Sequence, residues 1–197
     1  MIRFSHIRKR YGEKTVFNDF SLTLPEKGIV CLKAPSGFGK TTLFRLLLGL
    51  EKPESGMVEG TEGLRFSCVF QEPRLVPGLN ALENVLLVSG SRMPGSEEER
   101  KRAKKLLSDL GLTSELYSMP SGLSGGEKAR TALARALFPP FDVLILDEPF
   151  AGIDEERKEQ IYPMISALAK THLILMTTHQ EKDAEKLHAA VINLSQN

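Results

Sequence analysis

The sequence predicts an α/β fold with a parallel central sheet, an N-terminal antiparallel β element and an inserted helical subdomain. Three continuous apolar runs indicate the parallel sheet, because strands that are covered on both faces need such runs. They are IVCL at 29–32, VLIL at 143–146 and LILM at 173–176. Helical patterns lie between them, including residues 42–50 and the residues after Asp154, so strands and helices alternate.

Two other segments depart from this alternation. Residues 17–24, FNDFSLTL, alternate apolar and polar side chains, which is typical of a half-buried antiparallel strand. Residues 71–138 contain helix patterns and turn signals, with no comparable apolar β run. Within them, Ser96 and Glu99 form a capping box, and Gly111 marks the end of the helix that follows it.

Length and composition indicate one soluble globular domain. The chain has 197 residues, of which 41% are hydrophobic and 26% are charged, and this balance argues against disorder. We therefore expect a single domain over residues 1–197. Its sheet core would comprise residues 1–70 and 139–197, and its helical subdomain residues 71–138.

Charge and hydropathy restrict where the protein acts. The 26 basic and 25 acidic residues nearly cancel, so no overall field attracts nucleic acid. No apolar run approaches the roughly 18 residues of a spanning helix, and the N-terminal residues show no export signal. Cys31 and Cys68 lie in strand-like stretches and are expected to be buried reduced thiols, with a disulfide or metal site as the alternative. We expect a cytoplasmic protein without a nucleic-acid partner.

A glycine-rich loop at residues 34–42, APSGFGKTT, joins a strand pattern to a helix pattern. In this context backbone amides turn toward phosphate oxygens and the helix dipole adds to the attraction, so the segment predicts a P-loop NTPase. Lys40 would reach the β and γ phosphates, and Thr41 would hold Mg²⁺. The motif asks for glycine at position 34, where Ala34 suffices if its φ is negative. The other cradle residues are Ser36, Gly37, Phe38, Gly39 and Thr42.

Two further segments carry polar groups suited to phosphate chemistry. LSGGE at 123–127 offers a hydroxyl and backbone amides at a helix start, which can bind an anion or merely cap the helix. VLILDEP at 143–149 places Asp147 and Glu148 at the carboxyl end of a buried strand, where open α/β sheets bind ligands. The alternative for this acidic pair is a cap for the next helix.

These motifs, in this order, resemble those of the ATP-binding cassette (ABC) ATPases, and the resemblance extends from Tyr11 to His179. LSGGE is similar to the LSGGQ motif of that family, with Glu127 where Gln is usual. The resemblance implies ATP and Mg²⁺ as cofactors. It also implies a homodimer or heterodimer of cassettes arranged head to tail, in which each LSGGE surface faces the γ phosphate held by the other P-loop. The LSGGE residues that would face this phosphate are Ser124, Gly125 and Gly126.

The resemblance implies roles for five other residues. Asp147 would bind Mg²⁺, and Glu148 would be the general base that polarises the attacking water. Gln71 would contact Mg²⁺ and this water, and His179 would contact the γ phosphate. Tyr11 sits where an aromatic ring stacks on adenine. Taken alone, the histidine would be an ordinary strand-end residue and the tyrosine a core residue, and only the order and spacing of the motifs favour these roles.

AGID at 151–154 is similar to the D-loop of the same family, in which Asp154 would organise contacts across the dimer. Gln180 and Ile153 depart from the usual residues, but neither change removes a catalytic group. We therefore expect a competent Mg²⁺-dependent ATPase.

The resemblance implies the ATP-hydrolysing subunit of an ABC membrane transporter, held at the inner face of the cell membrane by transmembrane permease subunits. QEPRL at 71–75 and ALENV at 81–85 resemble importers of nitrate, sulfonates and taurine, which adds an extracytoplasmic solute-binding protein as a possible partner. Other importers, or an exporter of lipids or lipoproteins, remain open. The alternative is a soluble ABC ATPase of DNA repair or translation. The short segment between Gln71 and Ser124 and the single cassette disfavour it. A small-molecule kinase would have no use for LSGGE.

Overall fold

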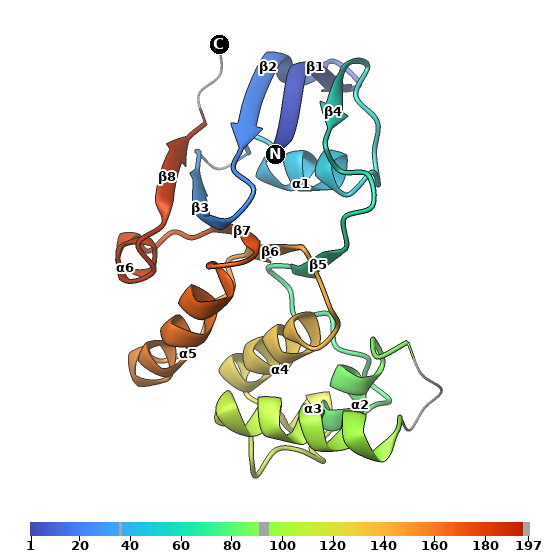
Figure 1. The fold of residues 1–197 in the computed structure, drawn as a ribbon, viewed down its shortest axis with the longest axis vertical. Coiled ribbons are helices and arrows are strands. Elements are labelled where there is room, and N and C mark those ends of the chain that lie inside the picture. Colours follow the sequence, from blue (N-terminus) through green and yellow to red (C-terminus); the bar gives the residue numbers. More distant parts are fainter. Residues whose placement is uncertain (36, 91–94, 195–197) are drawn as a thin grey trace.

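The computed structural model describes residues 1–35, 37–90 and 95–194, and contains a parallel and an antiparallel sheet (Figure 1). The parallel sheet has the strand order β5-β6-β7-β3-β8, and the antiparallel sheet has the order β2-β1-β4. This arrangement confirms the predicted α/β class and its N-terminal antiparallel element. The parallel strands are β3 (Gly28–Lys33), β5 (Phe66–Val69), β6 (Val143–Asp147), β7 (Leu173–Thr177) and β8 (Ala190–Asn193). The antiparallel strands are β1 (Ile2–Tyr11), β2 (Lys14–Leu24) and β4 (Ser55–Glu59).

The three apolar runs of the sequence lie in β3, β6 and β7, and every residue of β6 and β7 is buried. Alternate residues of these two strands point to opposite faces of the sheet, as the pleat requires. Leu144 and Ile174 belong to a core shared with α4 and α5, whereas Ile145 and Leu175 belong to a core shared with α1 and the antiparallel sheet. The parallel sheet is therefore the middle layer of the molecule.

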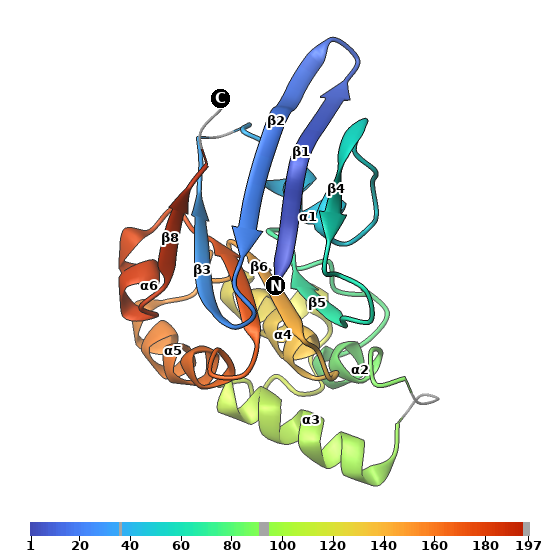
Figure 2. The same cartoon turned by 45° about the horizontal axis from the view of Figure 1, so that its top comes forward.

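Helices α2, α3 and α4 gather at one end of the molecule, away from β1 and β2 (Figures 1 and 2). The described part of residues 71–138 contains helices and a short 3-10 turn at Pro120–Gly122, and no strand. The helices are α1 (Lys40–Leu47), α2 (Ala81–Leu86), α3 (Glu97–Asp109), α4 (Gly125–Leu137), α5 (Glu155–Leu168) and α6 (Glu181–Lys186).

Local side chains set the helix ends. The predicted capping box of α3 is present, with the amide of Glu99 donating to Oγ of Ser96 at 3.2 Å and the reverse bond at 2.8 Å. The predicted helix over 42–50 has different bounds, since α1 begins at Lys40 and ends at Leu47. It ends early because the chain turns at Gly49, whose φ is 66°.

The two cysteines are free thiols. Cys31 is fully buried, but Cys68 is only partly buried, which corrects the expectation for the second one. Burial raises the pKa of the Cys68 thiol to about 11. Within the described residues, no cluster of His, Cys, Asp and Glu could hold a metal ion, and no helix has the length and hydropathy to cross a bilayer.

Candidate functional site

The P-loop connects the end of β3 to the start of α1, and two of its glycines have positive φ, 76° at Gly37 and 112° at Gly39. This backbone region favours glycine. A Cβ atom at Gly39 would also overlap Cγ1 of Val16. Glycine at position 39 is therefore required twice, by its own backbone and by the packing of β2. Ser36, also predicted for this loop, lies outside the described residues.

The start of α1 is open to an anion. Gly39 is its N-cap, and no side chain of the described part of the chain caps the helix there. Nζ of Lys40 donates to the carbonyl oxygen of Ala34 at 3.0 Å, so the ammonium group lies over the loop. Ala34 is not among the residues with positive φ, which meets the condition for alanine at this position. Thr41 is exposed beside it.

Three other predicted nucleotide contacts are Phe38, Thr42 and Tyr11, and the Tyr11 hydroxyl lies 3.5 Å from Oγ1 of Thr42. The side chains of Phe38 and Thr42 are buried, so Phe38 can face a ligand only through its backbone. Tyr11 is 43% exposed at the end of β1, and its hydroxyl donates to the Glu51 carboxylate. This hydrogen bond is the main reason why the pKa of Glu51 is lowered to about 2. Nζ of Lys9 lies 5.0 Å from the centroid of the Tyr11 ring. Stacking of Tyr11 on adenine stays a prediction.

The acidic pair lies at the carboxyl edge of the parallel sheet, because β6 and β7 pair with Asp147 opposite Thr177. Oγ1 of Thr177 donates to Oδ1 of Asp147 at 2.6 Å and accepts from the amide of Glu148 at 3.1 Å. Glu148 has a φ of 52°, which is unfavourable for a residue with a side chain. The hydroxyl of Thr177 thus fixes both acidic residues.

Glu148 and His179 lie side by side, although 30 residues separate them in the sequence. Oε1 of Glu148 is 3.3 Å from Nε2 of His179, and Oε2 accepts from the backbone amide of His179 at 3.2 Å. The glutamate side chain is 13% exposed and the histidine side chain is 74% exposed. The carboxylate is therefore held at the sheet edge while the imidazole faces outward.

The segment that contains Gln71 follows β5 and is held by an arginine that no sequence motif singles out. Nη1 and Nη2 of Arg135, on α4, donate to the carbonyl oxygens of Arg74 at 2.9 Å and Pro73 at 2.8 Å. The signal for this contact is an arginine in the last turn of the helix after LSGGE, which sequence alone cannot connect to a segment 61 residues away.

The LSGGE loop is the start of α4, and it caps itself. Oγ of Ser124 accepts from the amide of Glu127 at 3.3 Å, and the Glu127 carboxylate accepts from the amide of Ser124 at 2.8 Å. The latter bond is the main cause of the lowered pKa of Glu127. A Cβ atom at Gly126 would lie 2.6 Å from the carbonyl oxygen of Gly152. The LSGGE and AGID segments therefore touch through their backbones.

Five of the predicted residues line two cavities. One, of about 360 Å³, contains Lys40 and His179. The other, of about 260 Å³, contains Gln71, Gly125 and Glu148. Among the described residues that line them, none is common to both. Lys40 and the LSGGE loop of one chain are therefore not brought to the same cavity.

The chemistry of these groups fits ATP and Mg²⁺. Gly37 and Gly39 give the loop its positive-φ conformation, and a helix start without a side-chain cap favours a polyphosphate. The oxygens of Thr41, Asp147 and Gln71 are the hard ligands that Mg²⁺ prefers. A strand, a phosphate-binding loop with its lysine and an acidic strand end define a P-loop nucleoside triphosphatase.

Comparisons with known proteins define the family. The ABC transporter family model matches residues 17–151. The sequence is 40% identical to an aliphatic sulfonates import ATP-binding protein, SsuB 1, of Rhodococcus jostii (strain RHA1), over 96% of this chain and 77% of that protein. It is also 40% identical to the SsuB 1 protein of Nocardia farcinica (strain IFM 10152), over 98% of this chain and 77% of that protein.

Two solved structures of an ABC cassette have the same fold as this chain. The dimeric structure of the bacterial ABC transporter cassette MJ0796 superposes with a TM-score of 0.86 at 29% identity, covering 98% of this chain and 94% of that one. A post-hydrolysis state of the same cassette, bound to ADP and Pi, gives 0.85 at 27% identity, covering 99% of this chain and 94% of that one. The chain belongs to the ABC transporter family. It is an ATP-hydrolysing cassette with ATP and Mg²⁺ as its cofactors, and the transporter interpretation is favoured over a soluble repair or translation factor.

Proposed function

We propose that this chain powers an importer, and that its cargo is an aliphatic sulfonate or a related small anion. The names of the relatives from Rhodococcus and Nocardia support this cargo. The observation that supports the two-chain mechanism is the similarity of the fold to the dimeric MJ0796 cassette, together with the position of the LSGGE loop outside the cavity that contains Lys40. Each catalytic site would then need two chains.

In the proposed site, the amides of Gly37 and Gly39 and the ammonium group of Lys40 bind the phosphates of ATP. The oxygens of Thr41, Gln71 and Asp147 would hold Mg²⁺, which would offset the negative charge of the phosphates. The other proposed contacts are Tyr11 with adenine, and Ser36, Phe38 and Thr42 with the phosphates and the loop.

Glu148 would orient the attacking water and accept its proton. Its carboxylate is held in place by the amide of His179 and is mostly shielded from solvent, which limits its movement. The exposed imidazole of His179 would donate to the γ phosphate, and Lys40 would offset the negative charge that develops there.

The partner cassette would complete the site with Ser124, Gly125 and Gly126. Because the Ser124 hydroxyl oxygen accepts from the Glu127 amide and the Ser124 amide donates to the Glu127 carboxylate, the donors left for the phosphate are the two glycine amides and the O–H of the serine. Two ATP molecules would close the dimer, and their hydrolysis would reopen it. The dimer can be formed by two copies of this chain or by two related chains.

The dimer would bind transmembrane permease subunits on the inner face of the cell membrane, and the importer would receive its cargo from an extracytoplasmic solute-binding protein. We also propose that residues 1–70 and 139–197 act as one subdomain and residues 71–138 as another. The helical content of the second segment supports this division.

The dimer is tested with Glu148→Gln, which removes the base but keeps the size of the side chain. With ATP and Mg²⁺ this variant should elute from gel filtration at twice the 21.8 kDa of the monomer, and with ADP it should elute as the monomer. A Glu148→Gln protein that is monomeric with ATP at all concentrations would refute the two-chain site.

Transport is tested by affinity purification from the native membrane. A hydrophobic multi-span partner should co-purify, and aliphatic sulfonate should raise the ATPase rate of the complex only when its solute-binding protein is added. Recovery with ribosomes or DNA instead would support the soluble alternative.

A further inference from the structure

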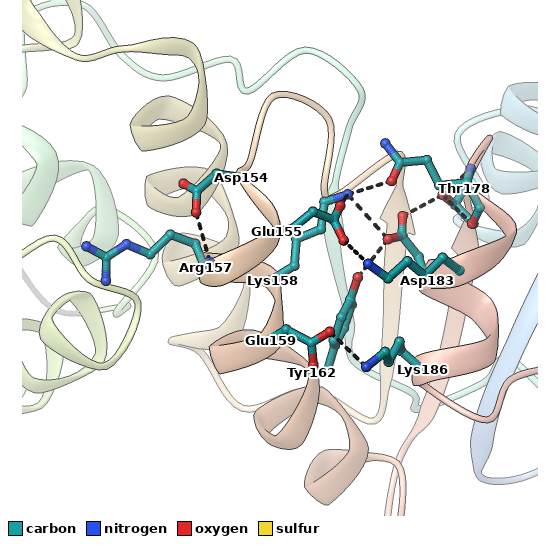
Figure 3. Close-up of polar contacts among 11 residues, drawn as sticks. Asp154, Glu155, Arg157, Lys158, Glu159, Tyr162, Thr178, Asp183 and Lys186 are labelled. Atoms are coloured by element: carbon teal, nitrogen blue, oxygen red, sulfur yellow. Dashed lines mark hydrogen bonds and ion pairs between the residues drawn. The ribbon is translucent and has the colours of Figure 1, made fainter.

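His179 lies between Thr178 and Gln180 in the sequence, and both of these residues bond to neighbouring helices. Figure 3 shows the contacts of Thr178, Lys158 and Asp183. Oγ1 of Thr178 donates to Oδ2 of Asp183, on α6, at 2.8 Å and accepts from the amide of Gln180 at 3.0 Å. Oε1 of Gln180 accepts from Nζ of Lys158, on α5, at 2.7 Å. The backbone on each side of the histidine is therefore anchored, while its ring is left exposed.

Lys158 and Asp183, which bind Gln180 and Thr178, form a buried pair of opposite charges. The side chains of Lys158 and Asp183 are each only 2% exposed, and Nζ lies 3.4 Å from Oδ1. The hydroxyl of Tyr162 donates to the same Oδ1 at 2.7 Å, and Glu155 accepts from Lys158 at 2.9 Å. Burial raises the pKa of Tyr162, so its hydroxyl remains a donor at all physiological pH values.

Such a pair is costly to bury and is only weakly favourable for stability, yet removal of one partner is strongly destabilising because it leaves the other charge buried and unpaired. A pair of this kind is suited to fixing a geometry. Its hydrogen bonds are satisfied in full: the ammonium group has Glu155, Gln180 and Asp183 as acceptors, and the carboxylate has three donors. The network thus has one arrangement in which every group is paired.

Helix α5, which carries Lys158, begins directly after Asp154, the last residue of the AGID segment. Oδ1 of Asp154 accepts from the amide of Arg157 and so caps α5, and Lys158 comes one residue later. Oδ2 of Asp154 lies 3.9 Å from Arg130 of α4. The first turn of α5 therefore connects the AGID segment to the residues beside His179.

We propose that Lys158 and Asp183 are positioning residues for His179, acting through Gln180 and Thr178. They hold the backbone of the histidine so that its ring stays next to the carboxylate of Glu148. This inference rests on the proposed function, because it assumes that His179 takes part in ATP hydrolysis. It adds the groups, on α5 and α6, that set the position of the histidine.

The test uses Thr178→Val, which keeps the size of the side chain but removes the hydroxyl that joins Asp183 to Gln180. The kcat for MgATP hydrolysis should fall about tenfold while KM changes less than about twofold, since the histidine is displaced but the phosphate loop is intact. Thr178→Ser restores the hydroxyl and should restore kcat.

Lys186→Ala is the matched control. It breaks an ion pair with Glu159, 2.9 Å long, across the same two helices, but it touches neither neighbour of His179. Its kcat should equal that of the wild type. If Lys186→Ala lowers kcat as much as Thr178→Val does, the network only joins α5 to α6 and the inference is wrong.

A second readout reports on the histidine itself. The chain has four histidines, so proton–carbon NMR spectra of ring-labelled protein are simple, and His179→Gln assigns the resonance of interest. Thr178→Val should shift the His179 ring signals, whereas Lys186→Ala should not. If Thr178→Val does not fold, Gln180→Ala, at an exposed position, must give the same shift and a smaller loss of kcat.

The two hypotheses fail differently. A fully active His179→Ala protein would refute the proposed role of the histidine. An inactive His179→Ala protein together with a fully active Thr178→Val protein, whose histidine signals are unchanged, would refute the positioning inference alone.

Discussion

Two glycine-rich loops lead into helices in this chain, and they differ in how the helix begins. The P-loop enters α1 through Gly39, with no side-chain cap in the described structure and with a lysine over the loop. The LSGGE loop enters α4 through Ser124, which forms a complete capping box with Glu127. The backbone amides at the start of α1 are therefore available to an anion, whereas the start of α4 is already capped by its own side chains. This difference supports the proposal that the P-loop binds nucleotide and that the LSGGE loop completes the site of a partner chain.

The largest effect is expected when the lysine of the P-loop is removed. Lys40→Ala should lower the ATPase rate by about 100-fold or more, because the charge that offsets the phosphates is lost. It should also abolish ATP-induced dimerisation in the Glu148→Gln background, measured by gel filtration. Lys101→Ala, at an exposed position on α3, is the control and should leave both unchanged. Normal turnover by Lys40→Ala would show that the open loop is not the phosphate site.

The two glycines of the capped loop should separate folding from assembly. Gly126→Ala places a Cβ 2.6 Å from the carbonyl oxygen of Gly152 and should lower both Tm and ATPase activity, by about tenfold for the latter. Gly125→Ala meets nothing within 4 Å and should keep its Tm but lose ATP-induced dimerisation. Gly122→Ala, equally open, is the control for both measurements. Equal Tm values for Gly125→Ala and Gly126→Ala would show that the contact with Gly152 does not constrain the loop.

Removal of the Ser124 cap of α4 should lower the free energy of unfolding. Ser124→Ala loses the acceptor for the amide of Glu127 and should lower the free energy of unfolding by about 1 kcal/mol. Glu127→Gln keeps an acceptor for the amide of Ser124 and should cost less than about 0.5 kcal/mol. Urea denaturation measures both. A stability loss for Glu127→Gln as large as that for Ser124→Ala would mean that the charge, not the capping geometry, stabilises the start of α4.

The smallest effect is expected far from both loops. Hydrogen bonds from the Arg65 side chain are the main reason why the pKa of Asp142 is lowered to about 2. Because the folded-state pKa lies below the unfolded value, the stabilisation is complete above about pH 4 and is lost as the pH falls toward 2. Asp142→Asn should therefore have a lower Tm than the wild type at pH 7, with roughly half of that difference gone by about pH 3. A Tm difference that is equal at both pH values would contradict the linkage.

Local features and the consequences of the parallel sheet could be predicted from the sequence. The three buried strands, the P-loop and the capping box of Ser96 are each encoded within a few residues. The meeting of Glu148 and His179 could also be anticipated, since both come directly after parallel strands whose carboxyl ends share an edge. The exact bounds of α1 and the partial exposure of Cys68 could not, because they depend on the turn at Gly49 and on the packing around β5.

Contacts between distant segments escaped prediction. Arg135 holds the backbone beyond Gln71, and the buried network of Lys158 and Asp183 anchors the neighbours of His179. Each joins side chains from elements whose relative placement is set by the core and not by any local pattern. The overlap of a Cβ at Gly126 with Gly152 is of the same kind. A motif can identify the residues that meet the ligand, but the groups that orient them become visible only in the folded chain.

The left-handed backbone at Glu148 has a consequence for protein engineering. A residue with a side chain costs about 1 kcal/mol in this conformation, which glycine adopts freely. A redesign that optimised thermal stability alone would therefore place glycine at position 148. The resulting protein would have a relaxed backbone there but would lack the carboxylate proposed as the general base. Screens for robust variants of this chain should score turnover alongside heat resistance, because at this position the two goals pull in opposite directions.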